Sequence, residues 1–279
     1  MKIIFFLFAI PLIILIRNAS ASETVYEPCS FACQSIPDSN HVLRTIGTPT
    51  KSELASKRIK VLAWNLYKGR KSEFSSIFEK LSMDKDLIML SEATTDDPVS
   101  TAMKKINNFG WIFATSFEMK NNVGTGTSVG SYAIPKDYRY YRTIDVEPYV
   151  KSPKAIAVAE YNLPGTTQTL LALSIHGINW SGDEALVRQL TATLPDLKQH
   201  QGPIIFAGDF NIKNPARLKL TQQILGEAGL TRVKWENPNL SKQLDDAFTR
   251  GLQVHSAKFI NDYINLASDH PAIELDVEL

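Results

Sequence analysis

One pattern constrains the fold of this chain more than any other: short apolar runs end in polar side chains. Residues 204–207 are apolar, and the chain then passes through a glycine to Asp209 and Asn211. A short apolar run is typical of a buried strand, and residues two apart on a strand project to the same side. We therefore expect the end of this strand to present both side chains in a cleft.

Other apolar runs end in the same way. KVLAWN ends in Asn65, LIMLSE ends in Glu92, LLALSIHGIN reaches His176 and Asn179, and residues 268–270 read SDH before the last strand. Each case alone is explained by a polar loop or by a structural histidine. Together they indicate one shared site, whose carboxylate and amide oxygens suit a hard cation such as Mg²⁺ rather than zinc.

The apolar patterns predict strands and helices that mix without strict alternation. Strands are predicted at residues 58–66, 86–93, 124–134, 155–163, 168–179, 204–211, 244–251 and 272–279. Helices are predicted at residues 74–83, 99–109 and 182–200, the last kinked or divided by Pro195. Another helix is expected from Pro215, capped by Asn214, to near Gly229. This mixture favours an α/β or α+β layered sandwich over a barrel.

The N-terminus has the order of a secretory signal peptide. A basic start, an apolar run at residues 3–16 and small residues up to Ala21 follow one another. The alternative is an uncleaved membrane anchor, but the run has 14 residues and a spanning helix needs about 20. We expect cleavage after Ala21, a secreted or periplasmic chain without a stable membrane anchor, an irregular lead-in at residues 22–57 and one domain at residues 58–279.

Charge gives nucleic-acid binding no support. The 279-residue chain has a formal net charge of +1, and removal of the signal peptide with Lys2 and Arg17 changes it to −1. Proteins that neutralise phosphates usually carry a basic excess. Residues 136–142 interleave bases with tyrosines, so they either contact nucleic acid by charge and stacking or form an edge strand with solvated side chains.

The chain has two cysteines, Cys29 and Cys33. In an exported chain they can pair with each other, stay free or bond to another molecule. No histidine lies close to them in the sequence, so they do not form a zinc site. We expect no catalytic role for them.

The order of the polar motifs resembles the endonuclease/exonuclease/phosphatase superfamily, the deoxyribonuclease I-like fold. The motifs are WN, SE, SIHGIN, GDFN, LDDAF and SDHPAI, and they extend from about Arg58 to the C-terminus. GDFN followed by a late SDH is the most specific pair, and residues 154–164 and 250–259 look closest to an uncharacterised bacterial branch. The resemblance implies a four-layer sandwich of two packed mixed β-sheets flanked by helices, with the site at one edge.

The resemblance also implies residues that hold a metal and the substrate. Glu92, Asn65 and Asp269 resemble metal-binding groups. Lys154 and Asn179 resemble contacts of the substrate phosphate, with Lys151 as the alternative to Lys154. A divalent ion that bridges phosphate oxygens offsets the charge that repels a nucleophile. The cofactor expected from this set is Mg²⁺ or Mn²⁺.

The catalytic residues implied by the resemblance are His176, Asp209, Asn211, Asp245 and His270. Asp209 and Asn211 would position the attacking water and the phosphate, and Asp245 rather than its neighbour would orient His270. In the nuclease branch a carboxylate orients the first histidine. Residues 124–134 offer hydroxyls instead, so we expect a hydroxyl or a backbone carbonyl to hold His176.

These observations predict a secreted, metal-dependent hydrolase of phosphate esters. A DNA endonuclease is the first expectation, and a phospholipid or inositol phosphate phosphatase is the second. A catalytically inactive binding protein on the same fold is the alternative from another class. Nothing in the sequence indicates the oligomeric state.

Overall fold

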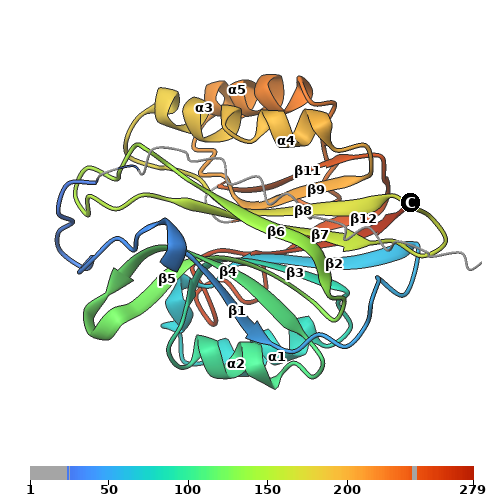
Figure 1. Ribbon diagram of the computed structural model, residues 1–279, viewed down its shortest axis with the longest axis horizontal. Coiled ribbons are helices and arrows are strands. Elements are labelled where there is room, and N and C mark those ends of the chain that lie inside the picture. Colours follow the sequence, from blue (N-terminus) through green and yellow to red (C-terminus); the bar gives the residue numbers. More distant parts are fainter. Residues whose placement is uncertain (1–23, 25, 241–243) are drawn as a thin grey trace, which may run out of the picture.

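The computed structural model of the protein describes residue 24, residues 26–240 and residues 244–279. These residues form two β-sheets packed face to face, with helices on both outer faces (Figure 1). The predicted fold, a four-layer sandwich with two mixed sheets, is confirmed. The predicted signal peptide and its cleavage after Ala21 lie outside the described residues.

Each sheet is mixed, because β2 and β3 pair in parallel in one sheet and β8 and β9 pair in parallel in the other. The seven-stranded sheet has the order β1 (Leu43–Gly47), β4 (Gly110–Met119), β5 (Val123–Ser131), β3 (Leu87–Thr94), β2 (Arg58–Asn65), β13 (Ala272–Glu278) and β12 (Gln253–Ile260). The six-stranded sheet has the order β10 (Thr231–Arg232), β11 (Asp245–Arg250), β9 (Ile204–Asp209), β8 (Thr169–His176), β7 (Ala155–Asn162) and β6 (Pro135–Arg142).

Strand β9 shows why a central strand of this fold is apolar along its whole length. Ile205 and Ala207 pack into the core between the two sheets. Ile204 and Phe206 point to the other side and pack beneath the helices. Since successive side chains alternate between the faces, a strand covered on both faces has no position for a polar residue until it ends.

Helices α1 (Phe74–Ser82) and α2 (Val99–Lys105) cover the seven-stranded sheet, and α3 (Asp183–Thr191), α4 (Leu194–Gln199) and α5 (Pro215–Gly226) cover the other sheet (Figure 1). The predicted division near Pro195 is confirmed, because α3 and α4 are separate helices. The Asn214 side chain accepts a hydrogen bond from the Arg217 amide at 2.9 Å, as an N-cap does. Helix α5 ends earlier than expected, since residues 227–229 continue only as a turn.

The predicted irregular lead-in contains a strand, β1, which pairs with β4. Strands β4 and β12 were not predicted either. Residues 136–142 lie in β6 at the edge of the six-stranded sheet, which agrees with the edge-strand alternative. Cys29 and Cys33 form a disulfide, with their Cα atoms 5.5 Å apart. Within the described part of the chain, no helix is both long and apolar enough to cross a membrane.

Candidate active site

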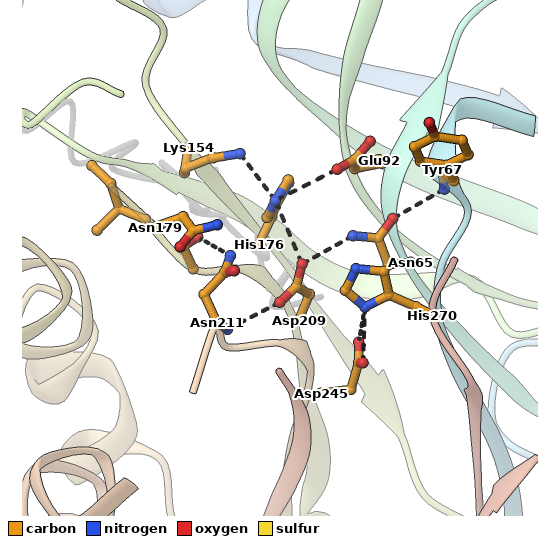
Figure 2. Close-up of polar contacts among 12 residues, drawn as sticks. Asn65, Tyr67, Glu92, Lys154, His176, Asn179, Asp209, Asn211, Asp245 and His270 are labelled. Atoms are coloured by element: carbon orange, nitrogen blue, oxygen red, sulfur yellow. Dashed lines mark hydrogen bonds and ion pairs between the residues drawn. The ribbon is translucent and has the colours of Figure 1, made fainter. Parts of the chain in front are cut away.

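Strand direction brings the candidate site to one edge of the sandwich. Strands β2, β8 and β9 end there with Asn65, His176 and Asp209. Strand β11 begins at the same edge, so Asp245 lies opposite Asp209 in the ladder, and His270 comes just before β13. His176, Asp209 and His270 line a cleft of about 430 Å³, and Figure 2 shows the five side chains converging.

Glu92 reaches this cleft through a β-bulge in β3. The pairing of β3 with β5 shifts register between Leu90 and Ala93, so two residues of β3 lie opposite one residue of β5. Glu92 is the second of the two and has a positive φ of 49°. A bulge bends the strand and redirects a side chain, and this one places the Glu92 carboxylate among the lining residues of the cleft.

Lys68 forms an ion pair with Glu92 through Nζ and Oε2. The other carboxylate oxygen, Oε1, lies 3.9 Å from Nε2 of His176. Burial raises the pKa of Glu92, but nearby positive charge, Lys68 first and Lys154 as well, outweighs burial and brings this pKa well below its usual value. The Glu92 carboxylate is therefore ionised, and a positive group, the Lys68 ammonium, already lies beside it.

His176 lies between a lysine and two carboxylates. Its Nε2 is 3.0 Å from Nζ of Lys154 and 3.6 Å from Oδ2 of Asp209. We expected a hydroxyl or a backbone carbonyl at this histidine, but among the described residues the hydrogen-bond partner of the ring is Lys154. Burial, reinforced by the charge of Lys154, brings the pKa of His176 well below its ordinary value, and burial also lowers the pKa of Lys154.

Asp209 is held by amides on both carboxylate oxygens. Oδ2 accepts a hydrogen bond from Nδ2 of Asn65 at 2.9 Å, and Oδ1 accepts one from the Asn211 amide at 3.0 Å. Asn211 donates its own Nδ2 to the Gly177 carbonyl at 2.7 Å, and Oδ1 of Asn65 accepts from the Tyr67 amide at 3.0 Å. Burial raises the pKa of Asp209 to about 6.

Asp245 contacts His270, whose Nδ1 lies 2.8 Å from Oδ2 and 3.0 Å from Oδ1 of the carboxylate. The next residue, Asp246, projects to the opposite side and accepts hydrogen bonds from Nε of Arg232 at 2.7 Å and Nε1 of Trp235 at 3.2 Å. The geometry is thus the one that an orienting role for Asp245 requires. The role itself remains a prediction.

The two histidines differ in charge. Burial lowers the pKa of His270, but the negative charges of Asp245 and Asp209 outweigh burial and raise it to about 10. At neutral pH His270 therefore carries a proton on both ring nitrogens, whereas His176 is neutral. Two groups of the same type whose pKa values are driven apart are a common mark of acid and base roles.

The other predicted residues also lie at the cleft: Lys154, Asn179 and the exposed Asp269 are among its lining residues. Sequence reasoning missed Glu147, a buried carboxylate 3.8 Å from Nζ of Lys154. Its two oxygens accept the backbone amides of Asn179 and Trp180, both at 2.8 Å. Lys68 was missed as well. Both residues lie outside the strands of the sheets, so no strand ending pointed to them.

The donor atoms of the site suit a hard divalent cation. One atom each of Asp209, Asp245 and His270 lie within 4.8 Å of one another, and because the His270 ring is protonated, the ligands that this group offers a cation are its two carboxylates. Glu92 and Asn65 add carboxylate and amide oxygens on the side of the seven-stranded sheet. A cleft with several carboxylates, an amide and an ion-paired ammonium can hold a cation and an anionic phosphate together.

Comparison with known proteins identifies the family. The model of the Endonuclease/Exonuclease/phosphatase family matches residues 62–270, which include Glu92, His176, Asp209 and His270. The chain therefore belongs to this family of phosphoesterases, whose members are hydrolases.

The relatives leave the substrate open. A UPF0294 protein of Vibrio parahaemolyticus is 31% identical over 206 residues, which cover 72% of this chain and 72% of the relative. A family protein from Leptotrichia buccalis is 19% identical with a TM-score of 0.60 and covers 79% of this chain and 100% of its own. The catalytic domain of human nocturnin, solved with a bound sulfate anion, is 15% identical with a TM-score of 0.62, covering 85% and 97%. These two structures share the fold with this chain.

Proposed function

We propose that this protein hydrolyses phosphate esters in the cleft at the sandwich edge with the help of a divalent cation, Mg²⁺ or Mn²⁺. The observation that carries the proposal is the convergence of Glu92, His176, Asp209 and His270 at one cleft from both sheets. The family contributes the reaction class. The sulfate anion bound by nocturnin is a tetrahedral oxyanion and is consistent with phosphate chemistry in this fold.

The residues that would hold the cation are Glu92, Asn65 and Asp269. Glu92 and Asn65 lie on adjacent strands that pair in parallel, and Asp269 lines the same cleft. When bound, the cation would supply Lewis-acid stabilisation of the phosphate oxygens. Asn65 also donates to Asp209, so the cation side and the water-activating side of the site are joined by one hydrogen bond.

The remaining side chains divide the acid–base and binding work. Asp209, held by Asn65 and Asn211, is placed to accept a proton from an attacking water. His270, protonated and held by Asp245, is placed to donate a proton or a hydrogen bond to a phosphate oxygen or the leaving group.

Lys154, His176 and Asn179 form the phosphate-binding side of the proposed site. The ammonium of Lys154 contacts the His176 ring. Glu147 contacts both Lys154 and the backbone amide of Asn179, so it holds these two residues on the same side of the cleft. A lysine and a neutral imidazole can both donate hydrogen bonds to phosphate oxygens. The predicted roles of Lys154 and Asn179 in phosphate contact are part of this proposal.

The test is hydrolysis of bis(p-nitrophenyl) phosphate and nicking of supercoiled plasmid, with Mg²⁺ or Mn²⁺ and with chelator. We expect metal-dependent turnover of the small diester that a chelator abolishes, and loss of this turnover in Glu92→Gln. The matched control is Glu79→Gln, because Glu79 is exposed on α1, away from the cleft. A protein inactive on plasmid, RNA, phospholipids, inositol phosphates and the small diester alike would instead be the inactive binding protein.

We further propose that the chain is exported. The apolar run at residues 3–16 and small residues before Ala21 support a signal peptide, and the disulfide between Cys29 and Cys33 suits an oxidising compartment. Mass spectrometry of the purified mature protein tests the proposal: its N-terminus should be Ser22. An intact Met1 in protein isolated from the producing cell contradicts it.

A further inference from the structure

An N-terminal segment joins the two sheets beside the cleft. We call residues 26–35 the N-terminal strap; Figure 1 shows this part of the chain in blue at one end of the sandwich. At one end of the strap, Ser35 bonds to Glu118 at the end of β4 through its hydroxyl at 2.9 Å and its carbonyl at 2.8 Å. At the other, the Ser30 amide and hydroxyl donate to the carbonyls of Val150 and Tyr149, at 3.0 and 2.7 Å.

The disulfide shapes the part of the strap that faces the cleft. Cys29 and Cys33 close a short turn, and Ala32 inside this turn is a lining residue of the cleft. Tyr149 and Val150, the residues that Ser30 binds, line the cleft as well. The strap and the connection between β6 and β7 therefore form one continuous wall.

Two residues of the strap also contact basic side chains near the cleft. Glu27 pairs with Lys151 at 3.3 Å, and Tyr26 stacks with the guanidinium of Arg142, which lies 4.9 Å from the ring centre. A polynucleotide is held mainly through basic side chains that are free to contact its phosphates, and two basic side chains of this region, Lys151 and Arg142, are already engaged by the strap.

We propose that the N-terminal strap restricts the substrate to compact phosphate esters and keeps long double-stranded nucleic acid out of the site. This inference rests on the proposed function and names its substrate class. A cleft of about 430 Å³ has the size of sites for small molecules, roughly 300–1,000 Å³. A duplex must cross the rims of the cleft to bring one phosphate inside, and the strap raises one of these rims.

The organic part of the ester would meet aromatic side chains. Tyr149 and Trp180 line the cleft, with 69% and 65% of their surfaces exposed. Nζ of Lys213 lies 4.7 Å from the Trp180 ring centre, so a cation and an aromatic face stand together at the mouth. A planar group attached to the phosphate can pack against such a surface, which makes bis(p-nitrophenyl) phosphate a suitable probe.

The experiment compares kcat/KM for this small diester with the rate of plasmid nicking, in the wild type and in variants that release the strap. The variants are Cys29→Ser combined with Cys33→Ser, and Ser30→Ala. The matched control is Ser76→Ala, which removes a similar exposed hydroxyl-to-carbonyl bond, of 3.0 Å, in α1. We expect release to raise the ratio of plasmid nicking to diester hydrolysis on the order of tenfold, the scale of one pocket contact, and the control to leave the ratio unchanged.

A second measurement separates the strap from the proposed activity. The affinity of each protein for a double-stranded oligonucleotide is measured by fluorescence anisotropy, which needs no turnover. Tighter binding after release supports the strap even if no ester is hydrolysed, and in that case the proposed function fails alone. If release changes neither the ratio nor the affinity in folded variants, the strap does not select the substrate. Ala32→Trp, which needs no loss of the disulfide, should lower kcat/KM for the small diester, and unchanged values would also overturn the proposal.

Discussion

At the scale of single residues, the candidate site separates two histidines by their surroundings. His176 lies beside the ammonium of Lys154, which disfavours a second positive charge. His270 lies beside the carboxylate of Asp245, which favours one. His176 is thus kept neutral and His270 is kept charged, so neither histidine can take the proposed role of the other.

Replacing either histidine should abolish most of the activity while the fold is retained. His176→Ala and His270→Ala each remove one acid–base or phosphate-binding group, and such a group contributes about 10²- to 10⁴-fold in rate. The control is His255→Ala, because His255 pairs with Glu278 on the β12–β13 ladder. The measurements are kcat/KM and circular dichroism. Full activity in either site variant means that the replaced histidine is not part of the machinery.

Asp246 should make stability depend on pH in a direction opposite to most carboxylates. Burial raises its pKa from 3.8 to about 6, against the opposing charge of Arg232. The folded state therefore holds this proton more tightly, so its contribution to stability is complete below pH 3.8 and is lost as the pH rises through 6. Relative to Asp246→Asn, which does not titrate, the wild-type free energy of unfolding should fall by about 2 kcal/mol between pH 4 and pH 7. Urea unfolding at both pH values measures this difference, and a difference that does not change with pH contradicts the assignment.

At the scale of elements, sequence patterns predicted the strands that are covered on both faces and missed several that are not. β7, β8 and β9 are long apolar runs, so their burial can be predicted from their amino-acid composition. β1 and β12 are edge strands of the seven-stranded sheet and are partly exposed, and their pattern is weak for this reason. The sequence of β4 is apolar enough, but its place between β1 and β5 depends on pairing that no local pattern specifies.

The same limit applies to the site. Residues that end buried strands, such as Asn65, His176 and Asp209, could be predicted because a strand must become polar where it leaves the core. Lys68 and Glu147 could not, because each acts through a contact with a residue distant in sequence, Glu92 for Lys68 and the backbone of Asn179 for Glu147. The expectation of a hydroxyl or a backbone carbonyl at His176 failed for the same reason, because only the folded chain brings Lys154 to the ring.

Because β4 and β5 approach each other closely at the bulges, a side chain at Gly126 should destabilise the fold. Gly126 lies in the cleft lining opposite Ala93, and a Cβ there would stand 1.9 Å from the Ala114 carbonyl oxygen. Gly126→Ala should therefore destabilise the fold by about 1–3 kcal/mol or more, since backbone must move. The comparison is Gly226→Ala in α5, where no atom lies within 4 Å of the added carbon and up to about 1 kcal/mol of stabilisation is expected. Thermal unfolding distinguishes them, and equal melting temperatures contradict the steric argument.

At the scale of the whole molecule, the site exists only where the two sheets meet. Asn65 of one sheet donates to Asp209 of the other, and the Ser174 hydroxyl in β8 donates to the Leu90 carbonyl in β3 at 2.9 Å. Hydrogen bonds therefore cross the sandwich next to an otherwise apolar core. Because the groups of the candidate site are divided between the sheets, any loosening of the packing between the sheets also separates Glu92 from His176.

The core between the sheets contains one polar group that should weaken it. Tyr161 is fully buried there, and its hydroxyl has no hydrogen-bond partner among the described residues. An unsatisfied buried hydroxyl costs about 1–3 kcal/mol, so Tyr161→Phe should leave stability unchanged or raise it by about 1 kcal/mol. The matched change is Tyr132→Phe, because the Tyr132 hydroxyl donates to Asp86 and accepts the Ala55 amide, both at 3.0 Å. This second variant should lose about 1–2 kcal/mol. Urea unfolding of both variants measures the contrast, and a loss of stability in Tyr161→Phe as large as that in Tyr132→Phe would show that the Tyr161 hydroxyl is satisfied in solution.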